Sequence, residues 1–254
     1  MIIIISPAKT LDFDNTIKTK KYSQPQFLAD SEVLVEALKE FSKKELAKRM
    51  NINQELASLN YERYQQWKKP FTPENAKQAL AVFKGQVFLG LNAKSLTNDE
   101  LLFAQNHLRI LSGLYGILRP LDLMQPYRLE MGTSLKNKRG ESLYKFWGTK
   151  ITDFINHELS KQKNKVLINL ASNEYYKSIQ PKKLNGKIIT PVFKETKGND
   201  FKVVAVYAKT ARGLMSRFMI KNKIEEPEQL KAFDSEGYLF NHELSTEKEW
   251  VFTR

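Results

Sequence analysis

The residues best suited to chemistry follow an apolar stretch at the start of the chain. Residues 2–5 are four consecutive isoleucines, which is typical of a strand buried on both faces, and the sequence Ser-Pro-Ala-Lys-Thr of residues 6–10 follows directly. Open α/β sheets bind ligands in the loops at the carboxyl ends of their strands. Lys9 is therefore predicted to neutralise a phosphate or, if desolvated beside other cations, to act as an amine nucleophile. The alternative is an ordinary turn lysine.

A second polar segment, residues 169–177, follows an expected strand over 165–170. It gathers amide, hydroxyl, carboxylate and phenol groups at a strand end, which is where polar sites are commonly built. Ser172, Glu174 and Tyr175 are candidates for an acid–base set, with Lys9 as nucleophile or phosphate anchor. Such a set would suit an enzyme that acts on a nucleotide, or a repair lyase whose lysine forms an imine with an abasic sugar.

Residues 42–64 are predicted to form a helix, a tight turn and a second helix. Residues 50–57 follow the spacing hydrophobic-Gly-hydrophobic-Gly-x-x-x-Ala of helix-hairpin-helix DNA-binding units, in which hairpin amides face a phosphate. Asn51 and Asn53 stand at the two glycine positions; Asn tolerates the left-handed conformation, and Asn53 can cap the second helix. Lys48 and Arg49 add positive charge before the turn. The alternative is an ordinary pair of short helices.

Positive charge is concentrated in one part of the chain. Residues 136–223 contain 20 Lys and Arg against six Asp and Glu, a net charge of +14, whereas the whole chain carries +13. A concentrated basic field attracts polyanions, and releasing their counterions favours binding without sequence preference. The alternative is a lysine-rich surface that promotes solubility. Together with Lys9, the cations that we expect to line a DNA-binding cleft are Arg128, Lys182, Lys183, Lys209, Arg212 and Arg217.

Residues 109–131 are predicted to be a rigid, irregular loop because they hold two glycines and two X-Pro pairs. Arg119, Asp122, Arg128 and Glu130 are many charges for so apolar a segment. Either salt bridges satisfy them internally or they line a polar cleft.

Strands and helices alternate along the chain, which predicts a single mixed α/β domain over residues 1–254, with a mixed sheet flanked by helices. Apolar runs predict strands over 86–91, 187–194 and 201–207, with a turn at 197–200. Helical spacing is expected over 25–67, from a cap at Thr72, from a cap at Thr97 to about 108, and over 142–159 and 210–223.

The composition excludes several classes of site. Cysteine is absent, so disulfides, thiolate nucleophiles and iron–sulfur clusters are excluded, and the three histidines are widely separated. We therefore expect no cofactor and no dedicated transition-metal site. No apolar run approaches the roughly 20 residues needed to cross a bilayer, and the start has no basic region of a signal peptide. A cytoplasmic protein without membrane contact is expected.

Several long strings resemble the YaaA family of bacterial peroxide stress resistance proteins. They are residues 2–12, 108–116, 119–132, 211–217 and 235–238, in the family's order and over essentially the whole chain. The resemblance implies a cytosolic protein that protects against hydrogen peroxide and limits damage by free iron. It also implies a single α/β domain of unusual topology, sometimes called a cantaloupe fold, with a basic cleft and a helix-hairpin-helix element.

The resemblance further implies binding to double-stranded and distorted DNA. Our leading interpretation is therefore a sequence-tolerant DNA-binding protein, with DNA as its partner and no protein partner expected. An enzyme using Lys9 is the alternative, and iron handling ranks last because the chain has few suitable ligands.

Overall fold

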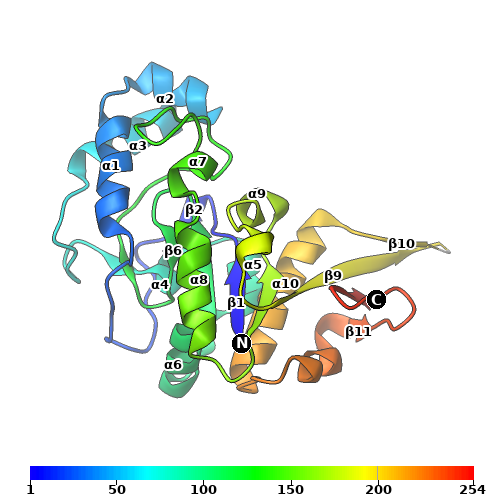
Figure 1. Cartoon of the computed structure of the whole chain (residues 1–254). Helices are drawn as coiled ribbons and strands as arrows, with labels where there is room; N and C mark the ends of the chain where they lie inside the picture. The colour runs from blue at the N-terminus through cyan, green and yellow to red at the C-terminus, as the bar shows by residue number, and fades with distance from the viewer. Residues whose placement is uncertain (199) are drawn as a thin grey trace.

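Strand β1 (Ile2–Ile5) lies at the centre of the main sheet, and all four isoleucines are buried, as their β-branched run predicts (Figure 1). The computed structural model describes residues 1–198 and 200–254, and within these residues the sheet has eight strands. Along the sheet the order is β11-β12-β9-β8-β1-β5-β6, with β10 paired to β9. The five strands from β12 to β5 run parallel, and antiparallel strands flank them. The predicted mixed sheet flanked by helices is confirmed.

The strands of the main sheet are short except for β9, which extends into a hairpin with β10. Their bounds are β5 (Leu108–Ser112), β6 (Gly116–Leu118), β8 (Val166–Leu170), β9 (Lys187–Lys197), β10 (Asp200–Lys202), β11 (Leu239–Phe240) and β12 (Glu249–Thr253). Two small ribbons pair β2 (Thr10–Leu11) with β4 (Phe83–Lys84) and β3 (Lys77–Gln78) with β7 (Leu123–Met124). Of the predicted turn at 197–200, Asn199 lies outside the described residues.

Helices α1, α2 and α3 form a group at one end of the molecule, and α8 lies beside β1, which it contacts (Figure 1). The α-helices are α1 (Leu28–Lys39), α2 (Lys43–Met50), α3 (Gln54–Gln66), α4 (Ala79–Val82), α5 (Gln86–Leu91), α6 (Asn98–His107), α7 (Leu143–Trp147), α8 (Lys150–Ser160), α9 (Asn173–Tyr176) and α10 (Ala205–Lys221). Short 3-10 helices are η1 (Ala93–Ser95), η2 (Pro181–Lys183), η3 (Pro227–Ala232) and η4 (Ser235–Gly237). None of these described helices is both long and apolar enough to span a membrane.

The predicted strand over residues 86–91 is wrong, because these residues form helix α5. An apolar run of six residues does not distinguish a strand from a buried helix by periodicity. Asn92 is a local signal of the helix end: it adopts the left-handed conformation at φ 49° and donates its backbone N–H to the Phe88 carbonyl.

The predicted helix at Thr72 is also wrong, since residues 72–75 form only a turn, in which the Asn75 side chain accepts from the Thr72 amide. Similarly, the strand predicted over 201–207 stops at Lys202, and α10 begins at Ala205. The predicted helix over 142–159 is divided into α7 and α8 at Gly148, whose φ is +51°. Helices α1, α2 and α3 fall within the predicted helical stretch, and the cap at Thr97 is confirmed as a capping box with Glu100.

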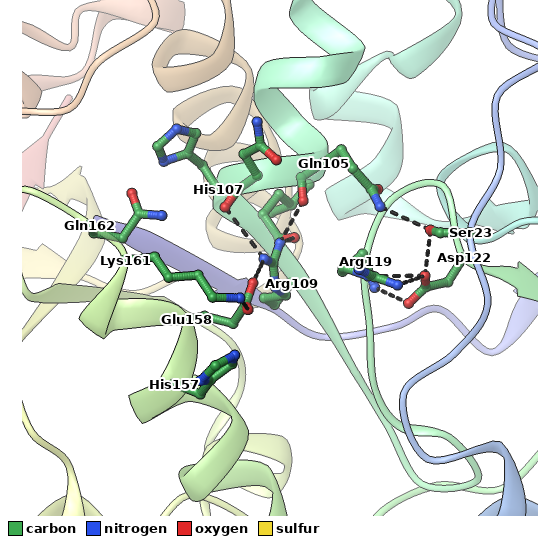
Figure 2. A network of polar contacts seen from close by, with 12 residues as sticks. Ser23, Gln105, His107, Arg109, Arg119, Asp122, His157, Glu158, Lys161 and Gln162 are labelled. Carbon is green, nitrogen blue, oxygen red and sulfur yellow. Dashed lines mark hydrogen bonds and ion pairs between the residues drawn. The ribbon is translucent and has the colours of Figure 1, made fainter.

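Residues 109–131 are an irregular loop only in part, because β5 and β6 form a hairpin and β7 pairs with β3, whereas residues 125–130 have no regular secondary structure. Some of the charges are satisfied internally: Arg119 Nη2 lies 3.0 Å from Asp122 Oδ1, and Asp122 also accepts from the Ser23 hydroxyl at 2.6 Å (Figure 2). Burial raises the pKa of the Asp122 carboxyl, and Arg119 opposes that rise. Both predicted alternatives therefore apply: Arg119 and Asp122 form an internal salt bridge, whereas Arg128 and Glu130 lie at a cavity.

Arg109 on β5 is buried at the amino edge of the sheet. Its guanidinium donates to the carbonyls of Gln105 and Leu108 at the end of α6 and pairs with Glu158 of α8 (Figure 2). A cation is favourable at the carboxyl end of a helix, where carbonyls lack partners. The side chain is only 1% exposed, so its role here is to join the end of α6 to α8.

Candidate functional site

Strands β1 and β8 are neighbours in the sheet, and the connections that follow them run to strands on opposite sides of this pair. From β1 the chain proceeds to β5 on one side, and from β8 it proceeds to β9 on the other. This arrangement opens a crevice outside the carboxyl ends of the two strands, which is where open α/β sheets bind ligands. The loop after β1 and the segment after β8, which the sequence singled out separately, meet at this point.

A cavity of ≈ 580 Å³ lies at this edge, a volume within the range of small-molecule sites. Its walls come from the loop after β1, the start of α5, the start of α9 and one side of α10. Four cations and one carboxylate line it, namely Lys9, Lys84, Lys209, Arg212 and Glu174. Of the predicted site residues, the cavity brings together Lys9, Ser172, Glu174, Tyr175, Lys209 and Arg212.

Glu130 connects Lys9 to Arg128 at the margin of this cavity. Its Oε1 lies 3.2 Å from the Lys9 ammonium and 2.9 Å from Arg128 Nη2. The second oxygen, Glu130 Oε2, and the Nε of Arg128 are both buried without a hydrogen-bond partner among the described residues. An adjoining space of ≈ 10 Å³ is lined by all three side chains, a volume close to that of one water molecule.

The acid–base candidates are held in place by backbone contacts. Glu174 Oε1 accepts from the Gly132 amide at 2.9 Å, and the Ser172 amide donates to Ser6 Oγ at 2.8 Å, so the loops after β1 and β8 are joined. Tyr175 is buried, and burial raises the pKa of its phenol, with a further rise from the Glu174 carboxylate. The Tyr175 phenol therefore remains protonated at neutral pH.

Arg212 and Lys209 lie on the same side of α10, one helical turn apart. Neither forms a hydrogen bond or an ion pair through its side chain with the rest of the described chain. Arg212 is half-buried, and burial lowers the pKa of its guanidinium with no carboxylate to offset the effect. A partly desolvated cation without a counterion makes this wall of the cavity attractive to an anion.

Sequence reasoning missed Phe88 because residues 86–91 were assigned to a strand, and it missed Lys84 because no local pattern pairs Lys84 with Thr10. Pairing of Thr10 with Lys84 in the β2–β4 ribbon brings the start of α5 beside the loop after β1. Gly85 permits this approach, since a methyl group there would lie 3.0 Å from the Cβ of Ala8. Asn92 was a local signal for the end of α5. No local signal in the sequence indicated the β2–β4 pairing that positions α5.

Three predicted cleft residues lie elsewhere. Lys182 borders a separate cavity with Lys187 and Glu249, and its neighbour Lys183 is exposed on η2. Arg217 donates to the Leu91 and Asn92 carbonyls at 3.1 and 3.2 Å and so caps the end of α5. Their roles in binding stay predictions.

The predicted hairpin residues connect α2 to α3. Asn51 adopts the left-handed conformation at φ 50°, and the Asn53 side chain accepts from the Leu56 amide at 2.9 Å as the cap of α3. Lys48 is exposed, whereas the Arg49 guanidinium lies over the Phe41 ring, 4.2 Å from its centre. These residues do not line the cavity, but the two are joined through α3, since the Tyr64 hydroxyl donates to the Arg128 carbonyl.

The fold and the cavity define a mixed α/β protein with a ligand-sized site at the carboxyl edge of a mostly parallel sheet. The model of one family, described as peroxide stress protein YaaA, matches residues 1–244. A protein of Saccharophagus degradans, described as a UPF0246 protein, is 54% identical over all 254 residues and is covered over 99% of its own length. The chain belongs to the peroxide stress protein YaaA family.

Proposed function

We propose that this protein binds DNA without strong sequence preference and thereby takes part in protection against peroxide stress. The observation that carries the proposal is the pair Lys209 and Arg212, whose side chains have no partner among the described residues and which line a cavity with four cations and one carboxylate. A patch of this kind attracts phosphates, and the surrounding segment 136–223 has a net charge of +14. Membership of a family described as peroxide stress proteins supports the biological role.

The hairpin between α2 and α3 is proposed as a second contact with the same duplex. The amides of Gln54 and Glu55 in the first turn of α3 have no backbone partner within a helix, so they are available to a phosphate. From Asn53 to Tyr64, which contacts Arg128, α3 rises about 16 Å at 1.5 Å per residue. A duplex lying along α3 would therefore span the distance from the hairpin to Arg128, at the margin of the cavity, within about five base pairs at 3.4 Å each.

Protection follows physically from this binding. A protein that covers the phosphate backbone displaces condensed cations, Fe²⁺ among them, so less hydroxyl radical forms at the DNA. Direct iron binding has less support, since the described residues contain no cluster of three or more His, Asp or Glu side chains suited to a metal. Coated DNA is expected to break more slowly than bare DNA in Fe²⁺ and peroxide.

Fluorescence anisotropy with a labelled duplex, titrated across salt concentrations, tests the proposal. The logarithm of the binding constant should fall linearly with the logarithm of salt, and K209A should reduce that slope by about one unit for every DNA sequence. The matched control is K163A, which removes an exposed lysine of the same basic segment at the amino edge, where it pairs with Glu226. Absence of binding at low salt, or an equal effect of K163A, would refute the proposal.

An enzyme using Lys9 is a second candidate, because Lys9, Ser172, Glu174 and Tyr175 line one cavity. Its amine would add to the aldehyde carbon of an abasic sugar and then lose water to form an imine. Against this, Lys9 is 67% exposed and ion-paired with Glu130, rather than desolvated as amine nucleophiles usually are. Borohydride should trap a covalent adduct on abasic DNA if the enzyme hypothesis holds, and no adduct is expected otherwise.

A further inference from the structure

The cavity between β1 and β8 is too small for a duplex. A sphere of its volume, ≈ 580 Å³, has a diameter of about 10 Å, whereas the major groove of B-DNA alone is about 12 Å wide. If DNA binds at this edge, as proposed above, the duplex must lie outside and only a smaller unit can enter. The volume nevertheless suits one small organic molecule.

Arg212 provides the anion-binding part of this cavity. Its guanidinium is half-buried, lines the cavity and has no carboxylate partner among the described residues. A planar guanidinium can donate two parallel hydrogen bonds to a phosphate, which makes such sites more selective than those of lysine. Lys209, one turn away on α10, adds a second positive charge that has no ion-pair partner among the described residues.

Glu174 argues against inorganic phosphate as the whole ligand, because a carboxylate repels an anion. Its Oε1 is occupied by the Gly132 amide, while its Oε2 has no hydrogen bond to any described residue and remains an acceptor. Carboxylates recognise the exocyclic amino group of a base, as Glu and Asp do with cytosine N4. The cavity therefore combines a cation for a phosphate with an acceptor for an amino group.

The remaining walls are largely apolar and suit the faces of a base. Val87, Phe88 and Tyr175 are each less than a tenth exposed, and Phe88 is held by stacking on Phe83 with ring centres 5.2 Å apart. Proteins that extract a base from DNA bury it against aromatic and apolar side chains and recognise its edge by hydrogen bonds. The cavity offers both kinds of surface, since Val87, Phe88 and Tyr175 line it together with Glu174 and Arg212.

We propose that this cavity receives a single unpaired nucleotide extruded from the bound DNA, with Arg212 on its phosphate and Glu174 Oε2 on an exocyclic amino group of its base. This inference rests on the proposed DNA binding and adds to it the part of the DNA that enters the cavity, a single nucleotide. It requires that cytosine or adenine, which carry amino groups, be preferred over thymine, which has a carbonyl oxygen at the corresponding position.

The test compares four labelled duplexes that are identical except at one site: fully paired, with an unpaired cytosine, with an unpaired thymine, and with an unpaired abasic sugar. The protein should bind the unpaired cytosine at least about tenfold more tightly than the abasic site, the effect of one charge-assisted hydrogen bond together with base burial. R212Q should weaken the binding of the three duplexes with an unpaired site by similar factors, because all three present the same phosphate to Arg212.

The substitution E174Q gives the sharpest result. The glutamine oxygen can still accept from the Gly132 amide, which preserves the local fold, but the free acceptor becomes an N–H donor. The preference should therefore change from unpaired cytosine to unpaired thymine. The matched control E243Q makes the same change at an exposed glutamate outside the cavity and should leave the preference for cytosine unchanged.

The outcomes separate the two proposals. If no duplex is bound, the proposed function fails. If all four duplexes are bound equally, DNA binding stands and the nucleotide site is refuted. If E174Q and the wild-type protein discriminate cytosine from thymine in the same way, Glu174 does not contact the base, and the proposed site is also refuted.

Discussion

Replacing Gly213 by alanine should destabilise the protein, although helix propensity alone predicts the opposite. Gly213 lies in the middle of α10, where alanine would normally stabilise a helix by about 1 kcal/mol. At this position, however, α10 crosses α5 so closely that the two backbones touch. A methyl carbon on Gly213 would lie 2.9 Å from the Leu91 amide nitrogen and closer still to the Val87 carbonyl oxygen.

The expected loss follows from that geometry. The methyl carbon would lie 1.9 Å from the Val87 carbonyl oxygen, so α5 and α10 would have to separate by at least about 1 Å to open that contact to 3.0 Å, which forfeits at least a quarter to a half of the dispersion energy of each affected contact. Overpacking of this kind costs up to about 3 kcal/mol, and here backbone atoms, which cannot rotate away, form the obstacle. After subtracting the propensity gain, we expect a net loss of about 2 kcal/mol in the free energy of unfolding.

Urea denaturation followed by circular dichroism measures this loss, with V206A on an exposed position of the same helix as the control. The control should change the free energy of unfolding by less than about 0.5 kcal/mol. A melting temperature lower by about 4–8 °C is expected for G213A. Unchanged or increased stability of G213A would refute the close packing of α5 on α10, and with it the position of two walls of the cavity.

Two further predictions concern the amino edge of the sheet. E158A leaves the buried Arg109 guanidinium without its carboxylate and should lower the free energy of unfolding by about 3 kcal/mol. The control K161A removes only the exposed partner of Glu158 and should lower it by less than about 1 kcal/mol. Equal losses of the two variants in urea denaturation would contradict this prediction. Burial lowers the pKa of the Met1 amine from 8.0 to about 6 and also lowers that of His107. The unfolded chain therefore binds more protons, and stability should fall as the pH drops from 8 to below 6, by roughly 1 kcal/mol for the partly solvated amine. The urea midpoint should depend less on pH across this range after the Met1 amine is acetylated. An unchanged pH dependence would show that Met1 is not responsible.

Local sequence predicted those elements whose signals lie within a few residues. The isoleucine run of β1 is buried on both faces, and α6 begins at Thr97 with the expected capping box. The same holds for the turn at Asn51 and Asn53, where side chains suited to a left-handed residue and to a helix cap occupy those positions. Their success has a physical reason, since caps and β-branched runs act through contacts made within one turn or strand.

Local sequence failed where distant packing decides the conformation. Residues 86–91 are apolar enough for a strand, yet close packing of Gly90 and Gly213 holds them as a helix against α10. The strand predicted over 201–207 ended early for the same reason, because α10 begins at Ala205 and packs against α5. In both cases the local sequence favoured a helix and a strand about equally, and tertiary contacts decided between them.

The sequence by itself determined that this chain has buried strands followed by polar loops, a concentrated positive charge and no cysteine chemistry. The sequence predicted that Lys9 and Glu174 each follow the end of a strand. It did not indicate that these two strand ends lie beside each other. Only the order β8-β1-β5 makes those two strand ends neighbours, and only the β2–β4 ribbon brings Lys84 to the same cavity. Strand order depends on which apolar faces bury one another over separations of more than a hundred residues, so no local pattern encodes it.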